Sequence, residues 1–296
     1  MVIMDTGSLQ AFVAVAETGS FSRAAEQLFL TQSAMSKRIS ILEQQLDCRL
    51  FDRIGRTVSL TEAGQELLPR ARKILLALED ARRSLSNLSG EISGSLSVAA
   101  SHHISLHRLP PILRQFTREC PEVKLDLRFD ESEIAYDNVL RGNLEIALIT
   151  LSPNPDPNIL SQTVWQDKLH YVVASDHPLA KLKQVTLEQL TDYPAILPGT
   201  ATFTRLIAEQ PFAKLNLQPD IAMSTNYLDT IKMMVEIGLG WSLLPETMSE
   251  HSLSVLNVDA PPVTRELGYI THKERTLSNA ARRFIHLLDQ AAEKGS

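Results

Sequence analysis

The sequence contains few residues of several kinds, and each scarcity excludes a class of protein. Among 296 residues there are only two cysteines. Cys48 and Cys120 lie in different segments, so we expect no disulfide framework, and at Cys48 a buried inert thiol is favoured over a redox sensor. No apolar run is long enough to span a bilayer, and the N-terminus lacks a charged-then-apolar export signal. The expected location is therefore a reducing cytoplasm, with no membrane partner.

Sequence motifs for catalysis are absent as well. The chain has no glycine-rich phosphate loop, no nucleophile elbow and no paired-cysteine motif. The acidic run at 130–133 is interpreted as a solvated loop rather than an acid/base pair. His103 and His107 are spaced to share a metal on a helix, with His102 beside them, but no third ligand stands at a convincing spacing. We therefore expect no enzyme, no metal site and no cofactor.

The charge balance has no basic excess, which by itself argues against nucleic acid, since the net charge is −6. The acidic excess is confined to one part of the chain. Residues 1–90 carry 11 Lys and Arg against 10 Asp and Glu, and residues 91–296 carry 18 against 25. The N-terminal part is close to neutral, so any DNA contact there depends on locally placed cations rather than on a broad field.

What the sequence does contain is a helix-turn-helix pattern at 20–46. Two short helical patterns are separated by the three residues 29–31, a turn of the size that joins such helices. In the first pattern Ala24, Ala25 and Leu28 share one face, and the alanines allow a second helix to approach closely. The second pattern has one narrow apolar stripe. The stripe consists of Met35, Ile39, Leu42 and Leu46.

The other side of the second pattern has no acidic residue and carries groups that bond phosphates and base edges. Thr31 is positioned to cap this helix. A polar face is also ordinary for a surface helix, and on the pattern alone that alternative competes with DNA binding. A hairpin at 50–61 around a glycine turn favours DNA, because cations on such a wing can reach phosphates or a minor groove. The expected DNA-binding residues are Ser22, Arg23, Thr31, Gln32, Ser33, Ser36, Lys37, Arg53 and Arg56.

A long helix is expected from about Thr61 to about Leu88. Two series of apolar residues, each spaced by seven, form a seam that another helix has to cover. Because the seam spans only about three heptads, a lone helix packed on its own domain is the alternative. The expected dimerisation residues are Leu67, Ile74, Leu78 and Leu85.

These motifs together resemble the winged helix-turn-helix of LysR-type transcriptional regulators. The resemblance is carried by FVAVAETGSFSRAA from Phe12, LTQSAMSKRI from Leu30, LFDR from Leu50 and LTEAG from Leu60, and the length and later organisation fit the same family. It implies a sequence-specific regulator with a dimerising linker helix, a C-terminal domain that binds a small co-inducer, and tetramers that bend DNA. One departure is Lys37, where the family usually has arginine. The ammonium group of lysine is a point charge and reads guanine less well than a guanidinium group does.

The remainder of the chain alternates strands and helices after a Gly/Ser hinge at 89–94. A right-handed βαβ series predicts a mostly parallel sheet covered by helices. The first expected series is a strand at 96–100, a helix at 109–118, a strand at 123–129, a helix at 134–141 and a strand at 144–150. The second has strands at 169–174, 195–197, 221–224 and 241–244 and helices at 203–208 and 227–238. A strand at 266–271 and a helix at 278–292 complete the pattern.

The chain is expected to cross between two lobes near Thr163 and to return near Arg265, which leaves a ligand cleft between the lobes. Ligands of parallel sheets bind beyond the carboxyl ends of strands, where hydroxyls and helix N-termini suit an anion. Simple helix capping is the alternative for each residue. The expected effector-binding residues are Ser101, His102, Thr150, Gly199, Thr200, Thr202 and Asn226.

The fold class expected is therefore α/β. It comprises a winged helix-turn-helix at 1–60, a linker helix at 61–90 and a two-lobed, periplasmic-binding-protein-like effector domain at 91–296. Lobe I consists of 91–162 and 266–296, and lobe II of 163–265. The expected partners are double-stranded promoter or operator DNA, an anionic metabolite, further copies of the chain in dimers and tetramers, and RNA polymerase. A solute-binding protein without DNA function is the runner-up, disfavoured by the first 88 residues.

Overall fold

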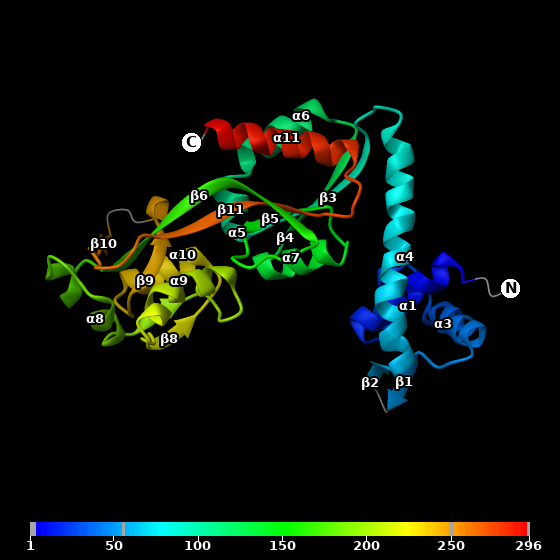
Figure 1. The fold of residues 1–296 in the computed structure, drawn as a ribbon, viewed down its shortest axis with the longest axis horizontal. Helices are drawn as coiled ribbons and strands as arrows, with labels where there is room; N and C mark the ends of the chain where they lie inside the picture. Colours follow the sequence, from blue (N-terminus) through cyan, green and yellow to red (C-terminus); the bar gives the residue numbers. More distant parts are fainter. Residues whose placement is uncertain (1–3, 55–56, 249–251, 295–296) are drawn as a thin grey trace. The chain divides into compact units, whose positions relative to one another are not determined.

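The computed structural model describes residues 4–54, 57–248 and 252–294 of the chain. It divides into two compact units, Met1–Ser89 and Gly90–Ser296 (Figure 1). Within the described ranges, no helix is both long and apolar enough to cross a membrane.

The first unit is a three-helix domain followed by a hairpin and a long helix. Side-chain caps explain where its helices begin: Asp5, Ser20 and Thr31 each accept a hydrogen bond from a backbone N–H in the first turn of the helix that follows. The cap predicted at Thr31 is confirmed. The elements are α1 (Thr6–Thr18), α2 (Phe21–Gln27), α3 (Gln32–Leu46), β1 (Phe51–Ile54), β2 (Thr57–Leu60) and α4 (Glu62–Asn87).

The core of this unit is formed where α3 packs on α1 and α2. Met35, Ile39 and Leu42 are fully buried, as the predicted apolar stripe requires, and Leu46 packs at its edge. Ala24 and Ala25 of α2 are buried against them. Burying each large aliphatic side chain contributes about 1.5–3 kcal/mol, so this stripe fixes the opposite face of α3 toward solvent.

The second unit contains a seven-stranded mixed sheet, a separate two-stranded sheet and the helices that cover them. The strands of the large sheet follow the order β10-β6-β11-β5-β3-β4, with β9 also paired to β6. The strands are β3 (Gly94–Ala100), β4 (Val123–Phe129), β5 (Ile146–Thr150), β6 (Ile159–Ala174), β7 (Ala195–Leu197), β8 (Ile221–Ser224), β9 (Ser242–Pro245), β10 (Leu253–Val255) and β11 (Val263–His272). The helices are α5 (His102–His107), α6 (Pro110–Glu119), α7 (Ser132–Leu140), α8 (Leu187–Thr191), α9 (Phe203–Lys214), α10 (Leu228–Glu236) and α11 (Asn279–Lys294), with short 3₁₀ turns at Pro178–Lys181 and Glu246–Met248.

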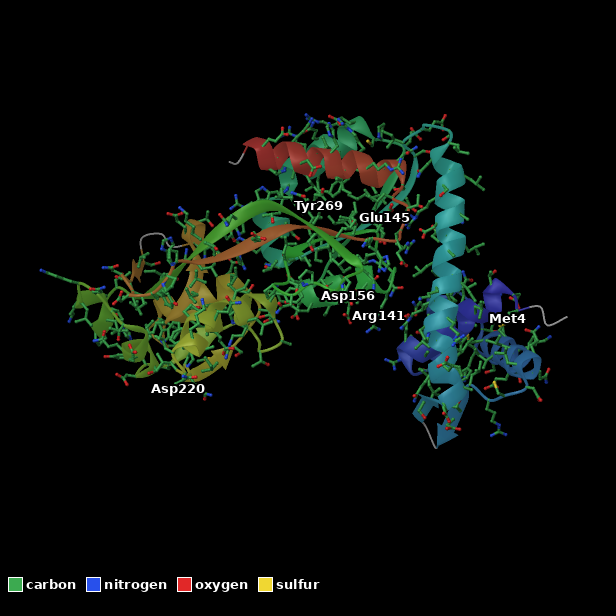
Figure 2. The ribbon with its side chains drawn as sticks, viewed as in Figure 1. Met4, Arg141, Glu145, Asp156, Asp220 and Tyr269 are labelled. Carbon is green, nitrogen blue, oxygen red and sulfur yellow. The ribbon has the colours of Figure 1, made fainter. Side chains whose placement is uncertain are left out.

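Two long antiparallel strands, β6 and β11, connect the two ends of this unit (Figure 1). Around one end, α6 and α11 cover one face of β3, β4 and β5, and α7 covers the other face. Figure 2 shows Tyr269 on β11 beneath α11, where its hydroxyl donates to Asp289 Oδ1 at 3.1 Å. Around the other end, α8, α9 and α10 pack with β7 and β9 on the second half of β6.

The expectation of a mostly parallel sheet is wrong for this unit. The pairs β3–β4, β3–β5 and β7–β8 are parallel, but β6–β9, β6–β10, β6–β11 and β5–β11 are antiparallel. The βαβ order predicted the relative direction of neighbouring strands only where a helix joins them. Strands β6 and β11 instead pair across almost a hundred residues of sequence. The register between these two strands shifts at Leu267 and Gly268, which is a β-bulge. Glycine is required at 268 because a Cβ there would lie 2.0 Å from the carbonyl oxygen of Gln162.

Candidate functional site

The polar face of α3 is open to solvent. Gln32, Ser33 and Lys37 are exposed, and Ser36 is partly exposed. Thr31 is held as the helix cap, since its Oγ1 accepts from Ala34 N at 3.2 Å and lies 3.0 Å from Ser33 Oγ. The first two turns of α3 therefore present hydroxyl, amide and ammonium groups, which suit phosphates and base edges.

Two further groups of predicted DNA-binding residues lie outside α3. Ser22 and Arg23 are exposed on α2, and the Arg23 guanidinium donates to the carbonyl oxygen of Thr18. In the wing, β1 and β2 form the expected antiparallel hairpin. The side chain of Arg53 and the whole of Arg56, at its turn, lie outside the described residues.

An unpredicted feature of the helix-turn-helix is Phe29, in the turn between α2 and α3. Its φ is 54°, a left-handed conformation that bulky side chains rarely adopt, and its side chain is 96% exposed. The strained backbone costs stability, and the exposed ring contributes no burial energy to offset that cost. Nothing in the turn pattern at 29–31 signalled that an aromatic residue would occupy this conformation.

Helix α4 presents an uncovered apolar stripe. Ala71 is buried in the core of the first unit and Leu67 packs against that core. C-terminal to Ala71, the apolar stripe is exposed to solvent at Ile74, Leu78 and Leu85. The side chain of Leu78 is 52% exposed and that of Leu85 is 71% exposed. The alternative of a helix packed entirely on its own domain thus accounts only for the first turns of α4.

A cavity of about 230 Å³ lies in the second unit, where the carboxyl ends of its parallel strands meet. The ends of β3, β4 and β5 supply one side, and the segments after β7 and β8 supply the other. The residues that line it are Ser101, His102, His103, Phe129, Asp130, Glu131, Ser132, Glu133, Thr150, Pro198, Thr202, Thr204, Asn226, Tyr227, Leu228 and Arg265.

Five of the seven predicted effector-binding residues line this cavity: Ser101, His102, Thr150, Thr202 and Asn226. Gly199 and Thr200 do not. Gly199 lies behind the lining, where its N–H donates to Asn226 Oδ1 at 2.9 Å, and Thr200 is exposed.

The hydroxyl of Thr202 is already engaged in capping α9. It accepts from Arg205 N at 3.2 Å and donates to the Gly199 carbonyl oxygen at 2.8 Å. Ser101 is different: it occupies the cap position of α5 without a side-chain capping bond. Helix capping is therefore sufficient to explain the hydroxyl side chain at Thr202, but it does not explain the one at Ser101.

The acidic run that follows β4 was missed as part of the site. The interpretation as a solvated loop holds for Asp130 and Glu131, which precede α7, but not for Glu133, which lies in α7 and is partly buried. Asp130, Glu131 and Glu133 all line the cavity. Glu131 Oε1 accepts from Asn226 Nδ2 at 2.7 Å, and Glu133 Oε1 accepts from Phe203 N at 2.6 Å, at the start of α9. Burial raises the pKa of Glu133. The rule used for Ser101 and Thr150 applies equally to the end of β4 and would have found these residues.

Arg265 reaches the cavity from β11 and is held by Asp167, its partner on β6. Its Nε and Nη2 donate to Asp167 Oδ2 at 3.1 and 2.8 Å, and Arg108 Nη2 donates to Oδ1 at 3.1 Å. His103 Nε2 lies 3.3 Å from Oδ2. Burial alone would raise the pKa of Asp167, but the contact with His103 and the charge of Arg265 outweigh it and hold that pKa well below its usual range.

Among the described residues, no group of three His, Cys, Asp or Glu side chains is arranged so that it could hold a metal ion. The rings of His103 and His107 lie 4.8 Å apart, and His102 packs edge-on against Tyr227 at 5.4 Å. Burial lowers the pKa of His103, which favours its neutral form.

The charge of the lining does not favour the anionic ligand expected from the sequence. The anion was inferred from hydroxyls and helix starts alone. The cavity instead has three carboxylates against the single guanidinium of Arg265, and Asp167 balances that guanidinium. An anion entering here would meet an excess of negative charge.

Comparisons with known proteins agree on one family. The family model described as the bacterial regulatory helix-turn-helix protein, lysR family, matches residues 6–65, and the LysR substrate binding domain matches residues 89–293. The HTH-type transcriptional regulator YeiE of Escherichia coli K12 is 33% identical over 288 residues, covering 96% of each chain.

Solved structures share the fold. A full-length OxyR variant from Pseudomonas aeruginosa superposes with a TM-score of 0.69 at 24% identity, covering 98% of this chain and 95% of that one. Full-length CbnR, solved in complex with its target DNA, gives a TM-score of 0.60 at 23% identity, covering 97% and 100%. With both family domains matched in order along the sequence, the chain belongs to the LysR family of transcriptional regulators.

Proposed function

We propose that the exposed face of α3 reads operator DNA, with Gln32, Ser33, Ser36 and Lys37 in the major groove. Their exposure, and the burial of the opposite stripe, support this placement. Ser22, Arg23 and Thr31 then bind the adjacent backbone, and the wing residues Arg53 and Arg56 bind flanking phosphates or a minor groove. The complex of CbnR with its target DNA is a precedent from the same fold.

Two chains pair through the exposed stripe of α4, in this proposal. Leu67, Ile74, Leu78 and Leu85 recur along one side of the helix, and the last three remain exposed within one chain. Pairing places two recognition helices on half-sites about one helical turn apart. Two such dimers form a tetramer. In the cytoplasm, the tetramer bound to DNA contacts RNA polymerase.

The cavity of the second unit is the proposed effector site. Its presence is the observation that supports control of this protein by a ligand. Separate hydrophobic cores on its two sides support lobes at 91–162 with 266–296 and at 163–265. The boundaries 1–60 and 61–90 then delimit the winged domain and the linker. Ser101, His102, Thr150, Thr202 and Asn226 contact the ligand directly, and Gly199 and Thr200 support the segment before α9.

Control follows from where the cavity lies. Arg265 belongs both to its lining and to β11, one of the two strands that join the lobes. A ligand that contacts this region favours one lobe angle over another, and it shifts DNA binding by no more free energy than its preference between those states. The role is regulatory, and no catalytic step is proposed.

A binding assay tests this function. The full chain is titrated onto the DNA upstream of its own coding sequence and onto scrambled DNA of equal length, at moderate salt. Specific binding roughly a thousandfold or more tighter than to the scrambled DNA is expected. Equal affinity for both would overturn the regulator proposal and leave a solute-binding protein.

A further inference from the structure

We propose that the effector is a small organic cation, held through a protonated amino group by the carboxylates of Glu131 and Glu133 and by the ring of Tyr227. The proposal rests on the proposed function, which makes the cavity the effector site, and it adds the chemical class of the ligand. Three features of the lining point to this class: its charge, the Glu133 carboxylate at the start of α9, and its exposed aromatic rings.

The charge of the lining attracts cations. Asp130, Glu131 and Glu133 contribute three negative charges, and the one positive side chain, Arg265, is doubly hydrogen-bonded to Asp167. Arg108 also bonds Asp167 from behind. The three acids and Asp167 carry four negative charges, and Arg265 and Arg108 carry two positive charges, so an excess of two negative charges remains around the cavity. The charge of Glu133, which is partly buried, is screened less than that of the exposed Glu131.

One helix N-terminus at which an anion could bind is already occupied. A helix N-terminus favours negative charge, and at α9 the Glu133 carboxylate fills this position by accepting from Phe203 N at 2.6 Å. At the start of α9 an anionic ligand would have to displace Glu133, whereas a cation can add to it. An ionised carboxylate accepts about four hydrogen bonds, so Glu133 and Glu131 each keep capacity for an ammonium group after bonding Phe203 N and Asn226.

A bound cation would also relieve a cost that Glu133 bears. Burial raises its pKa, because the charged carboxylate has lost part of its hydration, and the nearby charge of Glu131 acts in the same direction. An ammonium group between the two carboxylates reverses both effects. Binding should therefore favour the ionised form of Glu133.

Aromatic rings stand beside these acids. Tyr227 and Phe129 line the cavity although they are 56% and 65% exposed. Tyr227 is oriented by His102, whose ring meets it edge-on at 5.4 Å. The face of an aromatic ring attracts an ammonium group, by about 0.5–2 kcal/mol, so rings next to carboxylates form a recognisable pocket for amines.

The size of the cavity restricts the ligand further. At about 230 Å³ it is smaller than the roughly 300–1,000 Å³ typical of drug-sized ligands. A short amine of a few carbon atoms fits this volume.

Three four-carbon probes that differ only in charge test the proposal. Putrescine has an amino group at both ends, 4-aminobutyrate has one amino and one carboxylate end, and succinate has two carboxylates. Calorimetry on the full chain at neutral pH and low ionic strength is expected to rank putrescine tightest and succinate weakest. Putrescine should bind at least tenfold more tightly than succinate.

Variants then locate the binding. Glu131→Gln and Glu133→Gln each remove a charge but keep an oxygen acceptor for Asn226 and Phe203, so the fold is retained and thermal unfolding verifies it. Each should weaken putrescine roughly tenfold. Glu188→Gln is the matched control, because Glu188 is exposed on α8 outside the cavity, and its putrescine affinity should equal that of the wild type. Tyr227→Leu should weaken putrescine without changing the charge.

The proposal is overturned if succinate binds as tightly as putrescine, if none of the three probes binds, or if the glutamate variants bind putrescine as the wild type does. Specific DNA binding, measured on the same wild-type sample, separates this failure from that of the proposed function. If DNA is still bound specifically, only the ligand class is wrong. If DNA is not bound, the regulatory function itself fails.

Discussion

Replacing Asp167 by asparagine tests whether the buried charges between β6 and β11 hold the effector domain together. The side chains of Asp167 and Arg265 are only 2% and 4% exposed, and that of Arg108 is 30% exposed. Asparagine keeps the shape but removes the only negative charge in this group, so Arg265 remains buried without a counter-charge. Removing one partner of a buried pair costs about 3–5 kcal/mol, and the retained amide oxygen favours the lower end.

The effect should be visible in thermal unfolding of the effector domain. For a domain of this size about 1 kcal/mol lowers Tm by roughly 2–4 °C, so Asp167→Asn should lower it by about 6–12 °C. The pH dependence follows from the lowered pKa of Asp167. Its stabilisation is fully present above the unfolded carboxyl pKa of about 3.9 and is lost progressively as pH falls from there through the lowered pKa of the folded state. The difference from the wild type should therefore persist at neutral pH and narrow below about pH 4.

Asp126→Asn provides the matched control. Asp126 on β4 also pairs with an arginine, Arg128, at 2.9 Å, but both side chains are about half exposed. Exposed pairs contribute about 0–1 kcal/mol, so this variant should unfold close to the wild type. If Asp167→Asn and Asp126→Asn unfold at the same temperature at neutral pH, the reasoning about the buried charges is refuted.

Other predictions concern the first unit. Gln32→Ala should relax base preference by about 1–3 kcal/mol per lost contact, measured with single-base operator variants; an unchanged preference would mean that the reading face is misplaced. Lys37→Ala should weaken binding to all sequences and reduce the salt slope by about one. Leu78→Asp should give monomers in analytical ultracentrifugation and abolish operator binding, and a variant that stays dimeric would remove α4 as the interface. Phe29→Asn should raise the unfolding free energy by ~0.5–1 kcal/mol, since asparagine tolerates positive φ, whereas Phe29→Val should lower it; equal stability of the two would show that the turn is unstrained.

Local patterns were sufficient for much of the fold. The apolar spacing of Met35, Ile39 and Leu42 placed α3, and β4 was predicted at the observed bounds, Val123–Phe129. Both depend on neighbours in sequence, through side-chain periodicity and strand propensity. Helix α9 shows the limit of such patterns, because it continues to Lys214 through Pro211, beyond the predicted end at Ala208.

The features that depend on distant pairing were harder to predict. Strand β6 begins at Ile159, ten residues before the predicted start, because its first half is ordered by pairing with β11 rather than by its own alternation. The same pairing brings Asp167 and Arg265 together across 98 residues. In the sequence each reads as an ordinary surface charge. The cavity was located by the strand-end rule, but its charge was not, because only the structure shows Glu133 seated at α9.

The central claim is that two paired chains read two half-sites of DNA, and a hydroxyl-radical footprint on the DNA upstream of the coding sequence tests it most directly. Two protected segments are expected, with centres about one helical turn, roughly 10 base pairs, apart or a multiple of it. The protection should disappear with Leu78→Asp. A footprint without this spacing, or protection that survives in a monomeric variant, would contradict the account.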